Sequence, residues 1–232
     1  MVCPLVIPLV IAFSTAPGTG PGSVMSAPAP GMQEQSRAPI SYSAVELSLS
    51  TYVDAVYEQD ATAASVSVEW GEHAFAGVAV VSSKSDPLVN AGPLPIPGTQ
   101  SQDHVELGAG VHFEPLSAVS VYSTAAFGVH GTHAEPDGLS RYKSADAETF
   151  RYAIGVRARP MDQLEGFLEL ARHHWSYDSV LLGPDGSTSD SVLTLGTRIY
   201  TTDSLAVRLA WATGLTGDTE IDQATLGLTL FF

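Results

Sequence analysis

Five side chains that could carry hydrolytic chemistry lie near the ends of extended segments of this chain. They are His130, His133, His173, His174 and Asp178. A histidine acts as a general base only when its partner lies within hydrogen-bond reach, and spacing along the chain does not establish that here. The stronger expectation is that these histidines lie at one rim of a sheet without reacting. We therefore expect no enzyme activity and keep a rim protease as the least favoured alternative.

The spacing of the candidate ligand residues does not favour a metal-binding or a phosphate-binding site. His104 and His112 are eight residues apart in one extended segment, about 26 Å at about 3.3 Å per residue, so they cannot share an ion. Seven acidic residues expected in loops lack the fixed ligand spacing of a calcium loop: Asp86, Asp137, Asp146, Glu148, Asp178, Asp185 and Asp190. No glycine-rich segment leads into a helix, as a phosphate loop requires. The sequence predicts no cofactor and no metal site.

Charged residues recur on one face of the extended segments. Of the basic residues in these segments, only Arg172 falls on the apolar face. The ten charges on the other face are Glu46, Glu69, Glu106, Arg151, Arg157, Arg159, Glu165, Glu169, Arg198 and Arg208. If these faces line the inside of a narrow barrel, opposite charges should pair there, since a lone buried charge is costly. We predict a lumen plugged by Glu–Arg pairs.

Apolar residues alternate with polar ones from residue 41 onward, in stretches of about ten residues, the length of a tilted strand that crosses a membrane. In the clearest stretch, Val105 to Phe113 alternate with His104 to His112. The predicted strands are 41–53, 61–71, 74–83, 103–114, 118–130, 149–159, 164–177, 191–201, 205–215 and 224–232. Trp70, Trp175, Trp211, Tyr200 and Phe232 are candidates for aromatic girdles.

Short and long connections alternate between these strands. Short turns are expected at 72–73, 115–117, 160–162 and 202–204, and longer loops at 54–60, 84–102, 131–148, 178–190 and 216–219. This alternation is typical of a closed antiparallel up-and-down transmembrane β-barrel with both ends of the barrel chain on the periplasmic side. We predict ten strands, with eight as the alternative if the second and third strands merge differently. A soluble β-sandwich, with the apolar faces inward, is the competing fold.

The last segment favours the membrane barrel over the sandwich. Leu226, Leu228, Leu230 and Phe232 share one face, and Phe232 ends the strand. A closing strand that pairs with the first strand and carries an aromatic residue at the membrane rim is typical of such barrels. We predict that this segment closes the barrel.

Length, charge and the leading segment limit the remaining possibilities. The 232 residues suit one barrel domain, and a formal net charge of −15 argues against a nucleic-acid binder. The sequence contains no run of about 18 apolar residues, which a transmembrane helix would require. Residues 1–29 resemble a signal peptide, although no Lys or Arg precedes the apolar run. We expect residues 30–40 to form a periplasmic lead-in and residues 41–232 to form the barrel. Cys3, the single cysteine, falls in the expected signal.

Several stretches resemble the small outer-membrane β-barrel family of Gram-negative bacteria, often called porin-family or OmpA-like β-barrel domains. They begin at Tyr42 (YSAVELSL), Ser65 (SVSVEWG), Glu106 (ELGAGVHF), Arg151 (RYAIGVR) and Leu164 (LEGFLELA). The resemblance is one of pattern and covers residues 41–232. It implies location in the cell outer membrane and no cofactor. Implied partners are outer-membrane lipid and lipopolysaccharide, and the barrel-assembly machinery through the last strand.

The sequence therefore predicts an integral outer-membrane barrel with a plugged, charge-paired lumen and a structural or surface-interaction role. The alternative is a narrow porin-like channel for small solutes. A monomer is expected, because a closed barrel leaves no free strand edge in the membrane. No nucleic-acid partner is expected.

Overall fold

The computed structural model describes residues 40, 42–53, 58–85, 88–90, 95–116, 118–136, 142–179, 186–216 and 222–232. The expected signal peptide, and the lead-in apart from Ile40, lie outside these residues. All regular structure in the described part is β-strand, and no described helix is long and apolar enough to cross a membrane.

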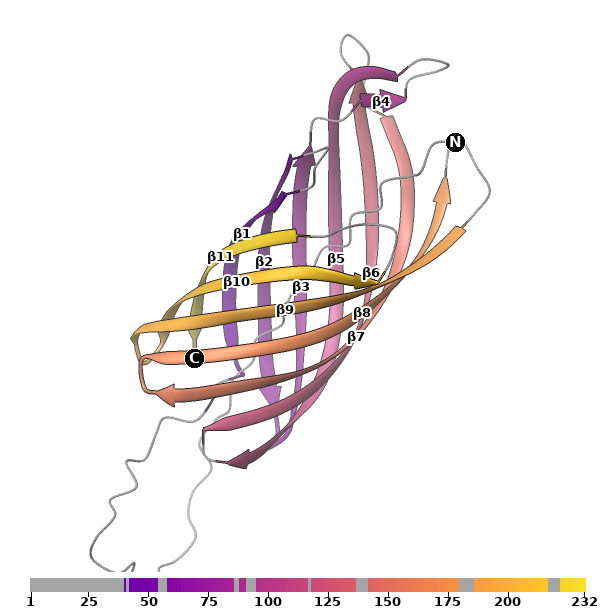
Figure 1. The fold of residues 1–232 in the computed structure, drawn as a ribbon. Helices are drawn as coiled ribbons and strands as arrows, with labels where there is room; N and C mark the ends of the chain where they lie inside the picture. Colours follow the sequence, from indigo (N-terminus) through magenta and orange to yellow (C-terminus); the bar gives the residue numbers. More distant parts are fainter. Residues whose placement is uncertain are drawn as a thin grey trace, which may run out of the picture.

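Ten long strands and one short strand make up the sheet. They are β1 (Ala44–Val53), β2 (Glu58–Trp70), β3 (Ala74–Ser85), β4 (Leu88–Asn90), β5 (Pro95–Leu116), β6 (Val119–Pro136), β7 (Tyr142–Met161), β8 (Leu164–Ser179), β9 (Gly186–Thr202), β10 (Leu205–Thr216) and β11 (Asp222–Phe231). Each long strand pairs antiparallel with its neighbours. Among the described residues, β4 pairs only with Pro95–Pro97, the first three residues of β5. Figure 1 shows the tilted strands wrapping around one axis.

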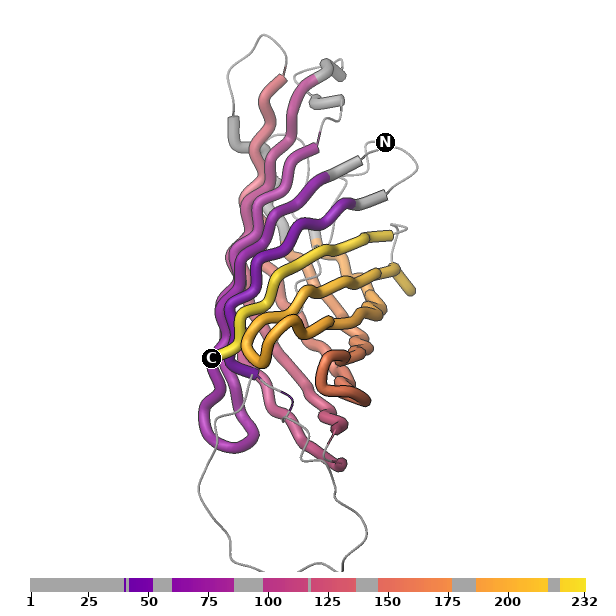
Figure 2. Tube along the Cα trace, turned by 90° about the vertical axis from the view of Figure 1, so that its left-hand side faces the viewer, coloured from indigo at the N-terminus to yellow at the C-terminus, as the bar shows by residue number. Residues whose placement is uncertain are grey.

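Two pairings close the sheet into a barrel. The last strand, β11, pairs with β1 from Ala44↔Phe231 to Tyr52↔Gln223. On the other side, β3 pairs directly with β5, although β4 lies between them in the chain. None of the described long strands is therefore left at an edge. Figure 2 shows the C-terminal end lying beside the start of β1. The prediction of a closed ten-stranded antiparallel barrel, closed by the last strand, is confirmed; the eight-stranded alternative is wrong.

The tight turns gather at the end of the barrel where β1 begins and β11 ends. The turn after β2 contains Gly71, whose φ of 77° is a left-handed conformation that glycine adopts without steric cost. The other short connections follow β5, β7 and β9. The strand ends that the longer connections join lie at the opposite end of the barrel, as the alternation of loop lengths predicts.

Five neighbouring strands are much longer than the sequence pattern predicts. β5 has 22 residues, β6 18, β7 20, β8 16 and β9 17. The remaining long strands have 10 to 13 residues. The predicted loops 84–102, 131–148 and 178–190 are therefore largely wrong. The alternation of apolar and polar residues stops where a strand extends beyond its apolar surroundings. The backbone hydrogen bonds to neighbouring strands continue past that point, so the periodicity underestimates the length of the strand. Figure 1 shows β5 and β6 rising to β4 above the level of β1 and β11.

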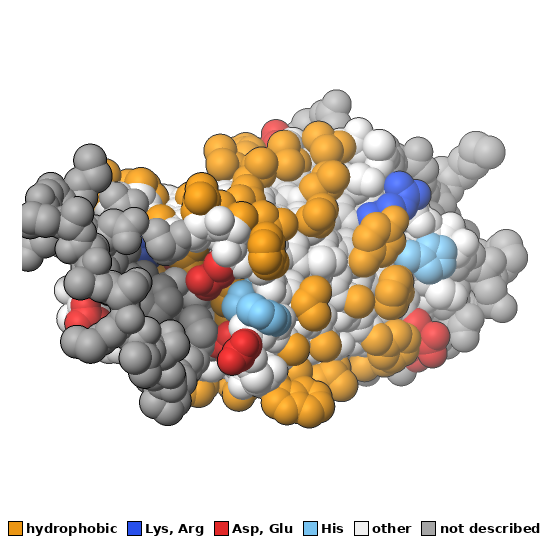
Figure 3. All heavy atoms as spheres, turned by 90° about the horizontal axis from the view of Figure 1, so that it is seen from below, with side chains coloured by type: hydrophobic (Ala, Val, Ile, Leu, Met, Phe, Trp, Pro, Cys, Tyr) orange, Lys and Arg blue, Asp and Glu red, His pale blue; other side chains and the backbone are white. Residues whose placement is uncertain are grey.

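The two faces of the sheet have reversed polarity relative to a soluble protein. Leu107 is 68% exposed, whereas Glu165 is fully buried inside. The exposed residues form an apolar belt: Leu47, Leu49, Val66, Val68, Val78, Val80, Val105, Leu107, Val111, Phe113, Val121, Phe127, Val129, Phe150, Tyr152, Ile154, Leu168, Leu170, Leu195, Ile199, Leu209, Trp211, Leu226, Leu228 and Leu230. Figure 3 shows this band in orange, with the charged and histidine side chains to either side of it.

Aromatic side chains divide between the two faces. Trp70, Trp211 and Phe232 are exposed on the outer face, as girdle residues would be. Trp175 and Tyr200 are buried inside the barrel, so their assignment to the girdles is wrong. Both sit at inward positions of their strands, and the hydroxyl of Tyr200 donates a hydrogen bond there to Glu165.

Candidate functional site

The most polar part of the barrel interior is organised around the carboxylate of Glu165. Arg157 donates to it from Nε at 2.8 Å and from Nη2 at 3.0 Å. Arg198, directly opposite on β9, donates from Nη1 at 2.7 Å, and the Tyr200 hydroxyl donates at 2.7 Å. Four charge-assisted or hydroxyl hydrogen bonds thus satisfy one buried carboxylate, which is the condition under which an ion pair is tolerated away from water.

A second carboxylate, Glu46 on β1, continues the network around the wall. It pairs with Arg208, lies 3.6 Å from Nη2 of Arg198, and accepts a hydrogen bond from Thr229 at 3.1 Å. Arg198 and Arg208 face each other across β9 and β10, and their repulsion is offset because both contact Glu46. The polar network therefore runs without a break across six consecutive strands, from β7 through β11 to β1, with charged side chains from five of them and the Thr229 hydroxyl from β11.

A third group lies on β6, β7 and β8. Arg151 donates from Nη2 to Glu169, and the Tyr122 hydroxyl donates to the same carboxylate at 2.9 Å. All three side chains are buried. Glu169 lies four residues beyond Glu165 along β8, with the inward-facing Phe167 between them, so the two carboxylates lie at different levels of the lumen.

The remaining predicted residues find partners other than the expected ones. Glu69 contacts Nε2 of His112 at 2.8 Å, and Glu106 contacts Nε2 of His104 at 3.4 Å. Arg159 donates to the backbone carbonyl of Asp162 at 2.6 Å and stacks 3.9 Å over the ring of Tyr200. Sequence reasoning missed both histidines as charge partners, although they share the inward face with the glutamates. On the β2–β5 side of the lumen, histidine takes the place of arginine.

The segment just before β1 enters the end of the lumen at which the tight turns lie. The Tyr42 hydroxyl lies 2.6 Å from the Ser120 hydroxyl, and its ring stacks on Phe75 and His112 at centroid distances of 5.2 and 4.3 Å. The guanidinium of Arg157 lies 4.6 Å from the centre of the same ring. Inside the barrel, Tyr42 thus contacts side chains of β3, β5, β6 and β7, one of which, Arg157, belongs to the charge network. Its place on the inward face was evident from the alternation, but its contacts across the lumen were not.

Aromatic rings also fill the interior by lying over glycines of the adjacent strand. A Cβ atom on Gly110 would come within 2.3 Å of Phe75, one on Gly155 within 2.3 Å of Tyr122, and one on Gly196 within 2.3 Å of Phe167. Each glycine faces its aromatic directly across a strand pair. At Gly110, Gly155 and Gly196 the interior therefore accommodates the aromatic ring only because the facing residue has no side chain.

The outer end of the lumen contains histidines and a tryptophan. The ring of Trp175 lies 6.1 Å from that of His104, 5.6 Å from that of His130 and 6.4 Å from that of His173. Polar atoms of these side chains without a hydrogen-bond partner include Nε2 of His173 and Nε1 of Trp175. Among the residues that the structure describes, no group of three or more His, Cys, Asp or Glu has the geometry of a metal site.

The candidate rim residues do not converge. His173 faces the lumen, whereas its neighbour His174 points outward and contacts the Ser189 hydroxyl at 2.9 Å. His130 faces the lumen beside Trp175, and the side chain of Asp178 lies outside the described residues. Of the acidic residues expected in loops, Asp146, Glu148, Asp178 and Asp190 lie in strands instead, and Asp86, Asp137 and Asp185 fall outside the described residues.

Comparison with known proteins gives structural neighbours only. No protein-family model matches the chain, and no curated protein matches it. Solved structures similar to it include the NanC porin (TM-score 0.43, 6% identity, 81% of this chain and 100% of that chain). Others are the translocator domain of the autotransporter NalP from Neisseria meningitidis (0.45, 9%, 82% and 87%) and Ail of Yersinia pestis (0.36, 10%, 82% and 97%). These structural neighbours are outer-membrane β-barrel proteins.

Proposed function

We propose that this chain is an integral outer-membrane β-barrel protein of a Gram-negative bacterium, with a plugged lumen and a role in surface interaction. The observation that carries the proposal is the reversed polarity of the sheet. A belt of leucine, valine and aromatic side chains faces outward, and the charged residues face inward. A soluble monomer rarely exposes so large an apolar surface, whereas a lipid bilayer requires it.

The interior supports a plug in place of an open pore. Glu46 and Glu165 hold together the arginines of β7, β9 and β10, and Tyr42 packs against Arg157. Small barrels are filled by side chains in this way. The rival function, a narrow channel, has one observation in its favour: the unpartnered polar atoms around Trp175 are groups that water could satisfy.

The long strands on one side support a role outside the cell. A membrane crossing takes about 9–11 residues of tilted strand, so the outer parts of β5–β9 project beyond the belt. We define these parts as the raised wall: residues 95–104, 130–136, 142–149, 173–179 and 186–190. Among the described residues, the backbone of Gly186–Ser189 pairs with β8 but not with β10. A strand with one unpaired edge can accept an extended peptide of another protein.

Fractionation and gel mobility test the location first. The protein should appear in the outer-membrane fraction and migrate faster without boiling than after boiling, because a hydrogen-bonded barrel resists the detergent until heated. A single unshifted band in the soluble periplasmic fraction would contradict the membrane barrel.

Bilayer recordings then separate the plug from the channel. Purified wild-type monomer should give no nanosiemens conductance steps, whereas Tyr42→Ala, which removes the ring that contacts Arg157 of the charge network, should raise the small-solute permeability of loaded vesicles. Tyr152→Ala, a change to an exposed tyrosine on the outer face, serves as the control. Stable nanosiemens steps from the wild-type protein would favour the channel.

A further inference from the structure

One arginine departs from the inward placement of the strand arginines. Arg172 on β8 is exposed on the outer face, directly above the apolar Leu168 and Leu170 of the same strand. Along β8 it is the first polar residue beyond the apolar belt. An arginine on the lipid face costs about 2–4 kcal/mol at the membrane midplane and about 0–1 kcal/mol near the interface. Its position therefore marks the outer boundary of the membrane.

The surroundings of Arg172 are hydroxyl groups and aromatic rings. Its Nη1 lies 3.3 Å from the hydroxyl of Ser191, and Tyr152 lies directly opposite on β7. Two residues further out, Nδ1 of His174 contacts the Ser189 hydroxyl at 2.9 Å, which leaves its Nε2 edge toward the outside. Among the side chains that the structure describes, no carboxylate forms an ion pair with Arg172. The guanidinium thus keeps most of its donors available.

We infer that Arg172, His174, Ser189 and Ser191 form a binding site for the phosphate of an outer-leaflet lipopolysaccharide. Arginine matches phosphate with a fork of N–H donors, and hydroxyls complete such a site. The ligand should be a lipid, because the apolar belt begins immediately below the site and Leu168 and Leu170 would lie along its acyl chains. The protein has a net charge of −15. An exposed arginine that forms no ion pair with a described carboxylate is therefore a local positive charge that can attract a phosphate.

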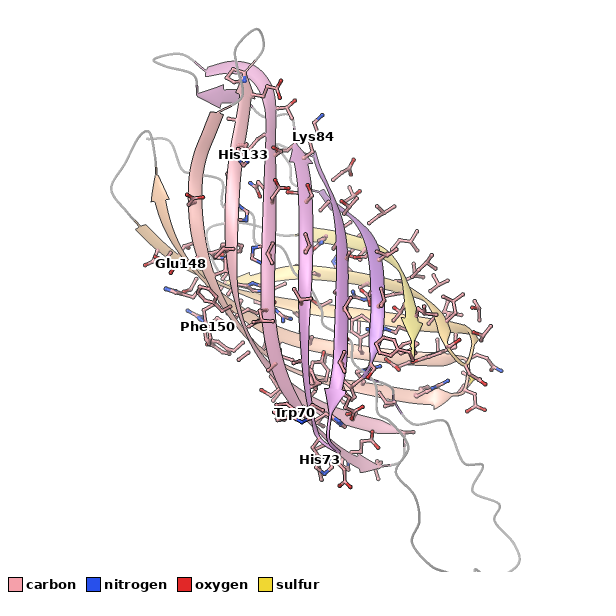
Figure 4. All side chains as sticks on the ribbon, turned by 180° about the vertical axis from the view of Figure 1, so that it is seen from behind. Trp70, His73, Lys84, His133, Glu148 and Phe150 are labelled. Carbon is pink, nitrogen blue, oxygen red and sulfur yellow. The ribbon has the colours of Figure 1, made fainter. Side chains whose placement is uncertain are left out.

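The chain offers a matched control on the other side of the barrel. Lys84 projects from β3, and Glu148 and Phe150 project from β7 (Figure 4). Phe150 lies directly opposite His174 of the proposed site. Lys84 lies directly opposite Asp60 on β2, so a carboxylate is already available to it. A change at Lys84 removes the same unit of outer charge without touching the proposed site.

The inference rests on the proposed membrane location, and the test separates the two. Barrels of the wild type, Arg172→Gln, Arg172→Lys and Lys84→Gln, each verified by heat-modifiable mobility, are titrated with bis-phosphorylated lipid A in detergent and analysed by native mass spectrometry. Arg172→Gln should weaken binding about tenfold, as expected for the loss of one charge-assisted hydrogen bond. Lys84→Gln should stay within about twofold of the wild type, and Arg172→Lys should lie between Arg172→Gln and the wild type.

Three results would overturn the inference while leaving the barrel proposal intact. One is undiminished lipid A binding by a heat-modifiable Arg172→Gln barrel. Another is equal weakening by Lys84→Gln, which would mean a diffuse charge effect. The third is loss of selectivity for a lipid-borne phosphate in the wild type. It would appear as displacement of lipid A by millimolar inorganic phosphate, or as equal binding of dephosphorylated lipid A. Absence of heat-modifiable mobility in the wild type would instead contradict the proposed function.

Discussion

At the scale of single residues, the interior depends on shared carboxylates. Glu165 accepts hydrogen bonds from Arg157, Arg198 and Tyr200, so one carboxylate pairs with two guanidinium groups, and Arg198 shares a second carboxylate, Glu46. The alternation of the sequence places these residues on the inward face, because side chains of a strand point alternately to its two sides. It does not indicate which glutamate meets which arginine, because Glu46 and Arg208 are brought together only by closure of the barrel.

Glu165→Gln should destabilise the barrel by about 3–5 kcal/mol, because two buried guanidinium groups would lose their counter-charge. The measurement is urea-induced unfolding in lipid vesicles, followed by tryptophan fluorescence. Glu148→Gln, a change to an exposed carboxylate of the raised wall, should leave the free energy of unfolding within about 0.5 kcal/mol of the wild type. Equal effects of the two substitutions would show that the Glu165 pairs contribute nothing to stability.

At the scale of strands, the fold depends on glycines that admit an aromatic ring from the next strand. Gly155 on β7 faces Tyr122 on β6, and their approach is closer than any side chain on residue 155 would allow. Such aromatic–glycine pairs help to fix the register of neighbouring strands. The sequence shows glycines on inward faces, but the aromatic partner of each follows from the pairing of strands and is not visible in either strand alone.

Gly155→Ala should cost about 1–3 kcal/mol, the usual penalty of overpacking. Gly166→Ala on β8 is the control, since a Cβ atom there meets nothing within 4 Å. In a Tyr122→Leu background the penalty of Gly155→Ala should largely disappear, which a double-mutant cycle of unfolding free energies measures. An unchanged penalty in that background would mean that Tyr122 is not the obstacle.

At the scale of the whole molecule, closure decides which face of the strands points inward. Ten strands in a single closed sheet leave one concave interior, and the charged faces fill it. The same alternation in two stacked sheets would place the apolar faces together and the charges in water. The pattern of the strands is thus compatible with both folds, and the closed pairing of β1 with β11 and β3 with β5 distinguishes them.

Leu107→Arg should destabilise the protein in a lipid bilayer by about 2–4 kcal/mol, because Leu107 lies within the apolar belt. Asp103→Arg, four residues further out on the same strand and also on the outer face, should cost no more than about 1 kcal/mol near the interface. Unfolding in vesicles compares the two. Equal and small effects would indicate that this face meets water, and the proposed membrane location would then be wrong.

The sequence by itself determined the number of long strands, the two faces of each strand, the alternation of short and long connections and the common face of ten charged residues. Each of these follows from local periodicity along one strand. The tertiary structure alone decided the rest: the pairing of Glu46 with Arg208, the use of His104 and His112 where arginine was expected, the entry of Tyr42 into the lumen and the height of the raised wall. These depend on register and closure, which bring together residues far apart in the chain. Where a strand leaves its apolar surroundings, only its hydrogen bonds to neighbouring strands show that it continues.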